Sequence, residues 1–240
     1  MVGGNFVARA VVRSIFLKRT AIKALEAFQP DIVVFRYPLT SYVLTLGLHA
    51  SFPRVRLISD HQTKEIQELR LGWPDKLFIP WEILRAKSHF SRANGLIAVT
   101  SEIRDYELRR AGKLLPSFVL TNGINVDEYP QKSFRPFRGD TQELSCIFVG
   151  ATSNPWHGLD RFLRGMAASN RNPRIHLSVV GQPNPEIVAL VSGLRLDTNI
   201  TFTGPLLGDE LSRLYDECHI AIGSLGIHRN GLRMASTIKV

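Results

Sequence analysis

The sequence predicts an α/β protein with two Rossmann-like domains. Two apolar, β-rich runs each lead directly into a glycine-containing loop: Val119–Leu120 precedes Thr121–Gly123, and Ile147–Val149 precedes Gly150. After Gly150 a helical pattern begins within a few residues. This is the arrangement by which an α/β sheet presents backbone N–H groups and helix N-termini to a ligand at its carboxyl edge.

The rest of the chain supports parallel sheets, because short β-branched runs alternate with helical periodicity as in βαβ units. The runs are continuously apolar, so we expect helices on both faces of each sheet. The expected strands are Asp31–Phe35, Val55–Ser59, Leu96–Thr100, Ser117–Thr121, Ser145–Val149, His176–Val180, Asn199–Thr203 and His219–Ile222. The expected helices are Phe6–Phe28, Thr63–Leu69, Lys76–Ala93, Glu102–Ala111, Leu159–Ser169, Pro185–Ser192 and Asp209–Cys218. The uncharged stretch Tyr37–Pro53 is interpreted as a buried loop and helix rather than a membrane span.

A polar segment divides the chain into two domains. Residues 128–143 are rich in charge, proline and glycine and form the expected linker between domains at 1–127 and 144–240. The chain begins with a helix and ends where another begins, and open sheets of this kind usually have more strands. We therefore expect both domains to be incomplete at the chain ends.

Composition is that of a globular protein with an uneven charge. Hydrophobic residues make up 44% and charged residues 21% of 240 residues, which excludes disorder and low complexity. The net charge is +9, of which residues 1–140 carry +8. Nucleic acid, an anionic membrane and a phosphorylated substrate are each compatible with this basicity. Cys146 and Cys218 are expected to be core residues, which weakly favours a reducing compartment.

Seven short motifs occur in an order that resembles one large enzyme family. The chain resembles the retaining glycosyltransferases of the GT-B fold, a group that includes the GT4 enzymes of bacterial polysaccharide and lipopolysaccharide assembly. The motifs are Pro30–Val34, Ser59–His61 with Glu65, Ala93–Ser101, Asn122–Gly123 with Asp127, Phe148–Gly150 with Gly158–Asp160, Leu177–Gly181, and Ile200–Pro205 with Leu211–Tyr215.

This resemblance implies an acceptor-side domain first and a donor-nucleotide-binding domain second. The implied reaction moves a sugar from a nucleoside-diphosphate sugar to a glycan or lipid-linked acceptor, with retention of the anomeric configuration. It implies no cofactor and no metal, because basic groups and helix N-termini neutralise the departing diphosphate. A cytoplasmic location follows, peripheral on the inner face of the membrane.

The resemblance also places the donor site, with departures from the family pattern. The family commonly has an Arg where this chain has Ala151 or Thr152, and a Lys where this chain has His157. Its paired glutamates would fall at Met234 and beyond Val240, and a thioether neither accepts a proton nor neutralises charge. The expected donor-binding residues are Gly150, His157, Gly158, Arg161, Ser236, Thr237, Ile238 and Lys239. As alternatives, Trp156-His157 packs the loop and Ser236 or Thr237 is an ordinary helix N-cap.

On the acceptor side the resemblance assigns a catalytic role to His61. The residue follows a strand, adjoins Asp60 and has Glu65 within one helical turn. The alternative is a hydrogen-bonded residue at the sheet edge. Asn122 and Gly123 are expected to shape the cleft as a turn, because glycine permits positive φ.

The first helix combines basic and apolar residues on one stripe. Arg9, Arg13, Arg19 and Lys23 share it with Val12 and Phe16. Such a stripe suits an anionic bilayer, and the alternative is a solvated basic face.

Three other classes of function were compared with the transferase. The pI of 9.9 suggests nucleic-acid binding, but no recognition helix, zinc spacing or RNA motif accompanies it. A glycoside hydrolase needs paired carboxylates across a cleft, and nothing in the sequence pairs them. The alternative that stays open is a catalytically inactive remnant of the same fold, which binds nucleotide sugar or nothing.

Overall fold

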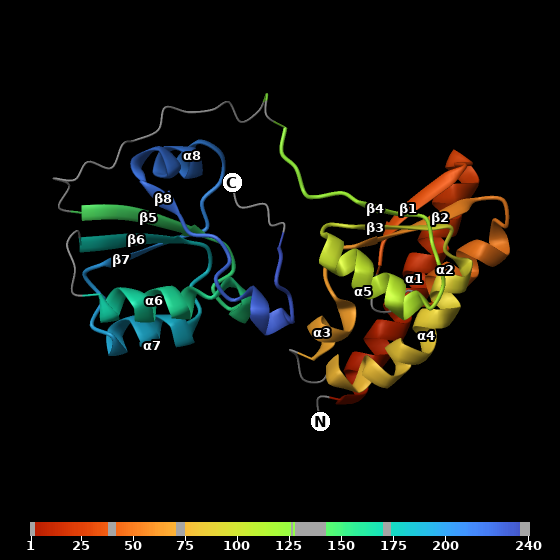
Figure 1. Ribbon diagram of the computed structural model, residues 1–240, viewed down its shortest axis with the longest axis horizontal. Helices are drawn as coiled ribbons and strands as arrows, with labels where there is room; N and C mark the ends of the chain where they lie inside the picture. The colour runs from red at the N-terminus through yellow and green to blue at the C-terminus, as the bar shows by residue number, and fades with distance from the viewer. Residues whose placement is uncertain are drawn as a thin grey trace. The chain divides into compact units, whose positions relative to one another are not determined.

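A computed structural model describes residues 3–37, 42–70, 75–125, 127, 143–169 and 174–235 (Figure 1). These residues form two compact units. Those of the first lie within Met1–Thr121 and Asn230–Ser236, and those of the second within Asn122–Arg229. Residues 230–235 therefore group with the first unit, although they follow the strands of the second in sequence.

The first unit contains a parallel sheet of four strands in the order β1-β2-β3-β4. The strands are β1 (Ile32–Arg36), β2 (Arg56–His61), β3 (Gly95–Ala98) and β4 (Ser117–Val119). The helices are α1 (Gly3–Phe28), α2 (Tyr42–Ser51), α3 (Glu65–Leu69), the 3₁₀ turn η1 (Asp75–Phe78), α4 (Ile79–Arg92) and α5 (Ser101–Ala111). Thr100 caps α5 by accepting a hydrogen bond from the Ile103 N–H, and Gly112 ends it in the left-handed conformation.

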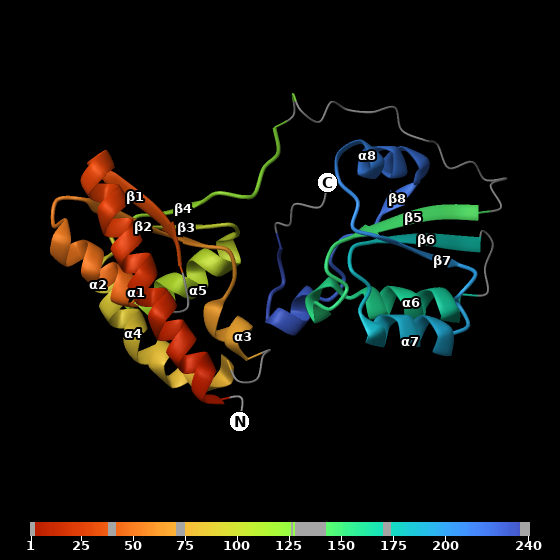
Figure 2. The same cartoon turned by 180° about the vertical axis from the view of Figure 1, so that it is seen from behind.

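Helices cover only one face of this sheet among the described residues. Leu57 and Ala98 are buried. The helices α2, α4 and α5 lie on one side of the sheet in Figures 1 and 2. On the other face Ile32, Val34 and Phe118 keep 55, 58 and 64% of their surface exposed. The expectation of helices on both faces is therefore wrong for this unit. The reason is topological: strands added in one direction through right-handed crossovers place every connecting helix on the same face.

The second unit contains a parallel sheet in the order β7-β6-β5-β8. The strands are β5 (Glu143–Val149), β6 (Arg174–Val180), β7 (Ile200–Gly204) and β8 (Ile220–Ala221). The helices are the 3₁₀ turn η2 (Pro155–His157), α6 (Leu159–Ala168), α7 (Pro185–Gly193), α8 (Gly208–Glu217) and the 3₁₀ turn η3 (Ile227–Asn230). Every expected strand is present within about two residues of its expected bounds.

Both faces of the second sheet are covered, as the apolar runs predict. Figures 1 and 2 show α6 and α7 on one side and α8 on the other. Phe148, Leu163 and Leu177 are fully buried between the layers. The strand order reverses between β5 and β8, and in open α/β sheets ligands bind at the carboxyl ends of strands at such a reversal.

No helix within the described ranges is long and apolar enough to cross a membrane. The helix α1 has 26 residues but is interrupted by basic side chains.

Candidate functional site

A cluster of polar side chains lies inside the first unit, at the carboxyl ends of β1 and β2. Its members come from the residue after β1, the end of β2, the start of α3, and the inward faces of α4 and α5. We call it the buried polar cluster, and it consists of Tyr37, His61, Glu65, Glu82, Arg85, His89, Glu107 and Arg110.

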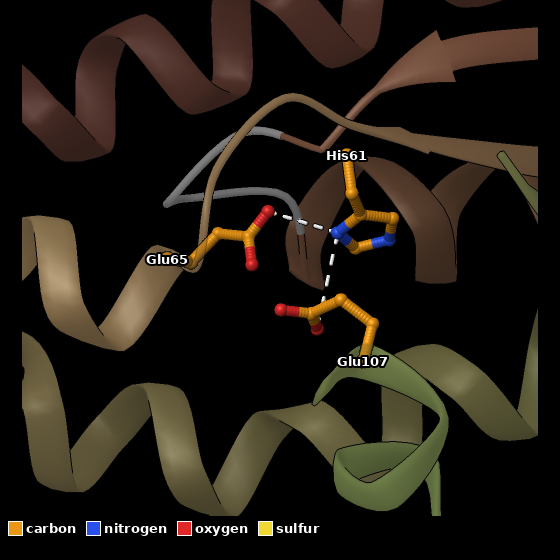
Figure 3. Close-up of side chains that lie close together, drawn as sticks. All are labelled: His61, Glu65 and Glu107. Carbon is orange, nitrogen blue, oxygen red and sulfur yellow. Dashed lines mark hydrogen bonds and ion pairs between the residues drawn. The ribbon is translucent and has the colours of Figure 1, made fainter. Parts of the chain in front are cut away.

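His61 has no exposed surface, and each of its ring nitrogens has a partner. Its Nδ1 donates to the Glu65 carboxylate at 2.8 Å (Figure 3). Its Nε2 lies 3.1 Å from the Ser59 hydroxyl, which donates to it. Glu107 approaches the same Nδ1 at 3.8 Å, and the Tyr37 ring stacks on the imidazole with centroids 4.8 Å apart. Burial lowers the pKa of His61 to about 4, so the ring is neutral at neutral pH.

Arg110 joins the carboxylates of the cluster from α5. Its Nη1 donates to Glu107 at 2.6 Å and to Glu65 at 3.2 Å, and its Nη2 donates to Glu82 at 2.6 Å. Tyr37 also donates to Glu82. One planar guanidinium thus satisfies three acids, which suits its fork of donors.

The cluster also has the composition of a metal site. His61, Glu65 and Glu107 offer ligand atoms within 4.8 Å of one another. However, Arg110 already contacts the Glu65 and Glu107 carboxylates and supplies the positive charge that a cation would bring. These residues in this arrangement therefore do not fit a metal ion.

Charge balance requires a proton within the cluster. Three carboxylic acids, Glu65, Glu82 and Glu107, face two guanidinium groups, those of Arg85 and Arg110. Burial, reinforced by the neighbouring Glu65, raises the pKa of Glu107 to about 9, and burial raises that of Glu65 to about 7. Glu107 therefore carries a proton at neutral pH, which lowers the negative charge that the two guanidinium groups must balance.

In this structure His61 is fully enclosed by its neighbours. It ties the end of β2 to α3, and Tyr37, Glu65 and Ser59 surround its ring. The catalytic role stays a prediction, and it would require the covering side chains to move.

The second unit carries a cavity of about 550 Å³ at the carboxyl edge of its sheet. Gly150 and Gly181 follow β5 and β6 with φ of +148° and +132°, and a Cβ on Gly181 would lie 2.4 Å from the Gly150 carbonyl oxygen. Only glycine permits these loops to approach so closely. The lining residues are Gly150, Ala151, Ser153, Gly181, Gln182, Pro183, Asn184, Pro185 and Pro205.

A second close approach lies beside this cavity, at the N-terminus of α6. Gly158 has a φ of +72°, and a Cβ there would lie 2.6 Å from the Gly226 nitrogen. The segment after β8 hydrogen-bonds this loop, since the Leu225 N–H donates to the His157 carbonyl at 2.8 Å. The α6 N-terminus is thus held against the carboxyl end of β8, where the strand order reverses.

His157 packs inside this loop. It is 6% exposed, and its Nδ1 donates to the Ala151 carbonyl at 2.8 Å. The Trp156 ring packs edge to face against the imidazole, with ring centroids 3.9 Å apart. This favours the alternative in which Trp156-His157 packs the loop, and donation from His157 to phosphate stays a prediction.

Arg161 holds the segment after β8 while its side chain stays exposed. Its Nη1 donates to the Leu225 carbonyl at 2.7 Å and lies 3.3 Å from the His228 Nδ1. Arg229 makes a bidentate pair with Asp160 in the first turn of α6, with both distances 2.8 Å. The sequence did not single out Arg229, because its partner lies 69 residues away.

The remaining expected site residues are not brought together. Asn122 and Gly123 lie in an exposed loop, and neither has a positive φ, so the expected turn conformation is wrong. Along α1, Arg19 and Lys23 are exposed, whereas Arg9 and Arg13 belong to the helix without described side chains. Ser236, Thr237, Ile238 and Lys239 lie outside the described residues.

Comparison with known families gives this site a context. Residues 143–236, which carry the cavity and the α6 N-terminus, match the family model described as Glycosyl transferases group 1. The resemblance to group 1 glycosyltransferases is thus confirmed. A search of curated proteins found no match.

Solved structures confirm the fold. Sucrose-phosphate synthase from Thermosynechococcus elongatus superposes with a TM-score of 0.61 at 17% identity, covering 85% of this chain and 53% of that one. Anabaena HepE in complex with UDP and glucose superposes with a TM-score of 0.62 at 15% identity, covering 87% of this chain and 56% of that one. Lipopolysaccharide outer core galactosyltransferase WaaB in its apo form superposes with a TM-score of 0.58 at 13% identity, covering 86% of this chain and 52% of that one. The chain has the GT-B type of fold and spans about half the length of these proteins.

Proposed function

We propose that this chain is part of a glycosyltransferase that takes a sugar from a nucleoside-diphosphate sugar and transfers it to a glycan or lipid-linked acceptor with retention. The observation that carries the proposal is the match of residues 143–236 to group 1 glycosyltransferases, over the unit that holds the cavity at Gly150 and Gly181. HepE, one of the similar structures, is described in complex with UDP and glucose. A role in bacterial surface polysaccharide synthesis belongs to the same proposal.

The chemistry assigned to the second unit is neutralisation of the leaving diphosphate. The loop after β5 and the N-terminus of α6 lie at the carboxyl end of the sheet, and the positive end of the α6 dipole favours negative charge such as that of a leaving diphosphate. Arg161 supplies an exposed positive charge one turn into α6. Ala151 provides no side chain for this task, so we propose a donor site formed mainly by backbone.

The alternative is a protein that binds the donor without turnover. Met234 stands where the family pattern places the first of its paired glutamates, and in the structure its side chain is 52% exposed. A thioether is a weak hydrogen-bond acceptor, so it cannot hold a hydroxyl in a fixed orientation, and it carries no charge.

A turnover assay separates the two. The chain is incubated with UDP-glucose, GDP-mannose and ADP-glucose, and nucleoside diphosphate release is followed while ¹H NMR records the anomer of the released or transferred sugar. The transferase predicts release from one donor class, with the product first appearing in the configuration of the donor. The inverted anomer would contradict retention. Donor binding without release would favour the inactive alternative.

We further propose that the first unit associates with an anionic membrane surface. On α1, Val12 and Phe16 are 65 and 67% exposed beside the exposed Arg19 and Lys23. The start of α4 with η1 adds exposed apolar and basic residues: Lys76, Leu77, Trp81, Leu84 and Lys87. Apolar side chains interleaved with lysine and arginine suit the interface of an anionic bilayer.

Vesicle sedimentation tests the membrane proposal. We expect binding to phosphatidylglycerol vesicles but not to phosphatidylcholine vesicles, and weaker binding at high salt. Trp81→Ser and Lys23→Glu should each reduce it several-fold, whereas Lys113→Glu, in the loop before β4, serves as the control. Equal binding to both kinds of vesicle, or none to either, would refute the proposal.

A further inference from the structure

A second cavity, of about 420 Å³, lies in the first unit. The residues that line it come from the start of α3, from α5, and from the segment after η3 that groups with this unit. They are Lys64, Glu102, Arg109, Gly231, Arg233 and Met234. The cavity is separate from the one at Gly150 and Gly181, since the two share no lining residue.

Hydrogen bonds to Glu102 build one wall of this cavity. Its carboxylate accepts from the Lys64 ammonium at 2.8 Å, from the Arg233 N–H at 2.8 Å and from the Met234 N–H at 3.0 Å. Lys64 donates in addition to the Gly231 carbonyl at 2.7 Å. Burial alone would raise the pKa of Glu102, but these donors outweigh it and lower the pKa. Lys64 and Glu102 therefore neutralise each other while they hold residues 231–234.

Two positive charges are left over. Arg109 lies two turns after Glu102 on the same face of α5, and Arg233 lies on the held segment. Both residues are exposed, and within the described ranges neither guanidinium has a hydrogen-bond or ion-pair partner. Two guanidinium forks at one cavity match a group with several anionic oxygens, because each fork can bind phosphate in a bidentate way.

We propose that this cavity binds a phosphate or diphosphate group of the acceptor. The identification of the ligand as the acceptor rests on the proposed function, whereas the binding of an anion rests on the charges alone. The assignment to the acceptor follows from the lining residues, all of which belong to the first unit. Among the described residues that line the cavity, Met234 is the only one with an apolar side chain, so the cavity suits a headgroup rather than a lipid tail.

Calorimetric titration with inorganic pyrophosphate and with UDP tests this. The variants are Arg109→Ala, Arg233→Ala and, as a control on the same helix, Arg104→Ala, whose side chain pairs with Asp105 instead. We expect each of the first two variants to weaken pyrophosphate binding about tenfold or more, as loss of a charged hydrogen bond does. The control should not change it, and UDP affinity should be the same in every variant. Thermal unfolding establishes that all variants are folded.

Three results would overturn the inference. The first is that the wild-type chain does not bind pyrophosphate. The second is that Arg109→Ala and Arg233→Ala bind it as well as wild type does. The third is that Arg104→Ala weakens pyrophosphate binding as much as those two variants do. If Arg109→Ala and Arg233→Ala lose UDP binding together with pyrophosphate binding, the cavity binds the donor diphosphate and the assignment to the acceptor is refuted. If UDP does not bind the protein while pyrophosphate binds as expected, the result would contradict the proposed function but support the anion site.

Discussion

Glu107 is buried beside another carboxylic acid, and its protonation decides whether the interior of the first unit is neutral. Its Oε2 lies 2.6 Å from Arg110 and 3.8 Å from His61. Arg110 also pairs with Glu65 and Glu82, so it is the residue whose loss leaves the most uncompensated charge. The two side chains should therefore respond very differently to substitution.

We expect Glu107→Gln to lower the free energy of unfolding by about 1 kcal/mol or less at pH 7, because the amide resembles the protonated acid. Arg110→Ala should lower it by about 3–5 kcal/mol, as breaking a buried ion pair does. Urea unfolding followed by circular dichroism measures both. A loss for Glu107→Gln as large as that for Arg110→Ala would show that Glu107 is ionised in the folded protein.

Stability should fall as the pH rises from 7 to 9. The unfolded chain releases the Glu107 proton near its ordinary pKa of 4.5, whereas the folded protein holds it to about 9, so alkali favours unfolding. Between pH 4.5 and 6.5 the raised pKa of Glu65 adds to the Glu107 effect, whereas the lowered pKa values of His61 and His89 act in the opposite direction and offset it, so the net decline lies at higher pH. The slope for one proton is about 1.4 kcal/mol per pH unit, and Glu107→Gln should remove that contribution. A profile of Glu107→Gln parallel to that of wild type would contradict this.

The sequence predicted the helices and strands well because short, continuously apolar runs alternate with segments of helical periodicity. The charged side chains on the inward faces of α4 and α5 were missed. Their signal was present: Glu82, Arg85 and His89 recur at the spacing of buried helical positions, as do Ile103 and Glu107. Charges at core positions indicate a buried network, but only the packed helices reveal which residues pair.

The loop before α6 should tolerate no side chain at residue 158. Gly158→Ala is expected to lower the free energy of unfolding by about 2 kcal/mol or more, because the methyl group meets the backbone of residues 225 and 226 at a positive φ. Gly165→Ala, inside the same helix with nothing within 4 Å of its Cβ, should raise it by about 0.5–1 kcal/mol. Thermal unfolding compares the two, and a neutral Gly158→Ala would refute the described packing.

For the whole molecule, the sequence predicted two parallel-sheet units correctly, but its prediction of helices on both faces was wrong for the first unit. Apolar runs such as Ile32–Phe35 are compatible with one covered face or two, since strand order decides which. The donor-side loop was located from Phe148–Gly150 and Gly158, whereas the burial of His157 depends on Ala151 and Trp156, which only the fold brings together.

The uncovered sheet face should bind apolar dyes. Val34 and Phe118 are more than half exposed there, so the chain should enhance the fluorescence of anilinonaphthalene sulfonate without denaturant. The double variant Val34→Thr with Phe118→Thr, which retains strand preference, should remove about half of the enhancement. Leu114→Thr, at an isolated exposed loop residue, is the control. Equal fluorescence from all three proteins would show that this face is covered in solution.

We propose that the loop after β5 binds the diphosphate of a nucleotide sugar. Calorimetric titration of UDP, GDP and ADP into wild type, Ala151→Glu and Ala168→Glu tests this proposal. Both alanines are exposed, but Ala151 lines the cavity while Ala168 lies at the end of α6, toward the opposite edge of the sheet. We predict that one nucleotide binds wild type and Ala168→Glu alike, and that Ala151→Glu weakens it about tenfold or more through charge repulsion. No binding by folded wild type, or equal binding by Ala151→Glu, would contradict the claim.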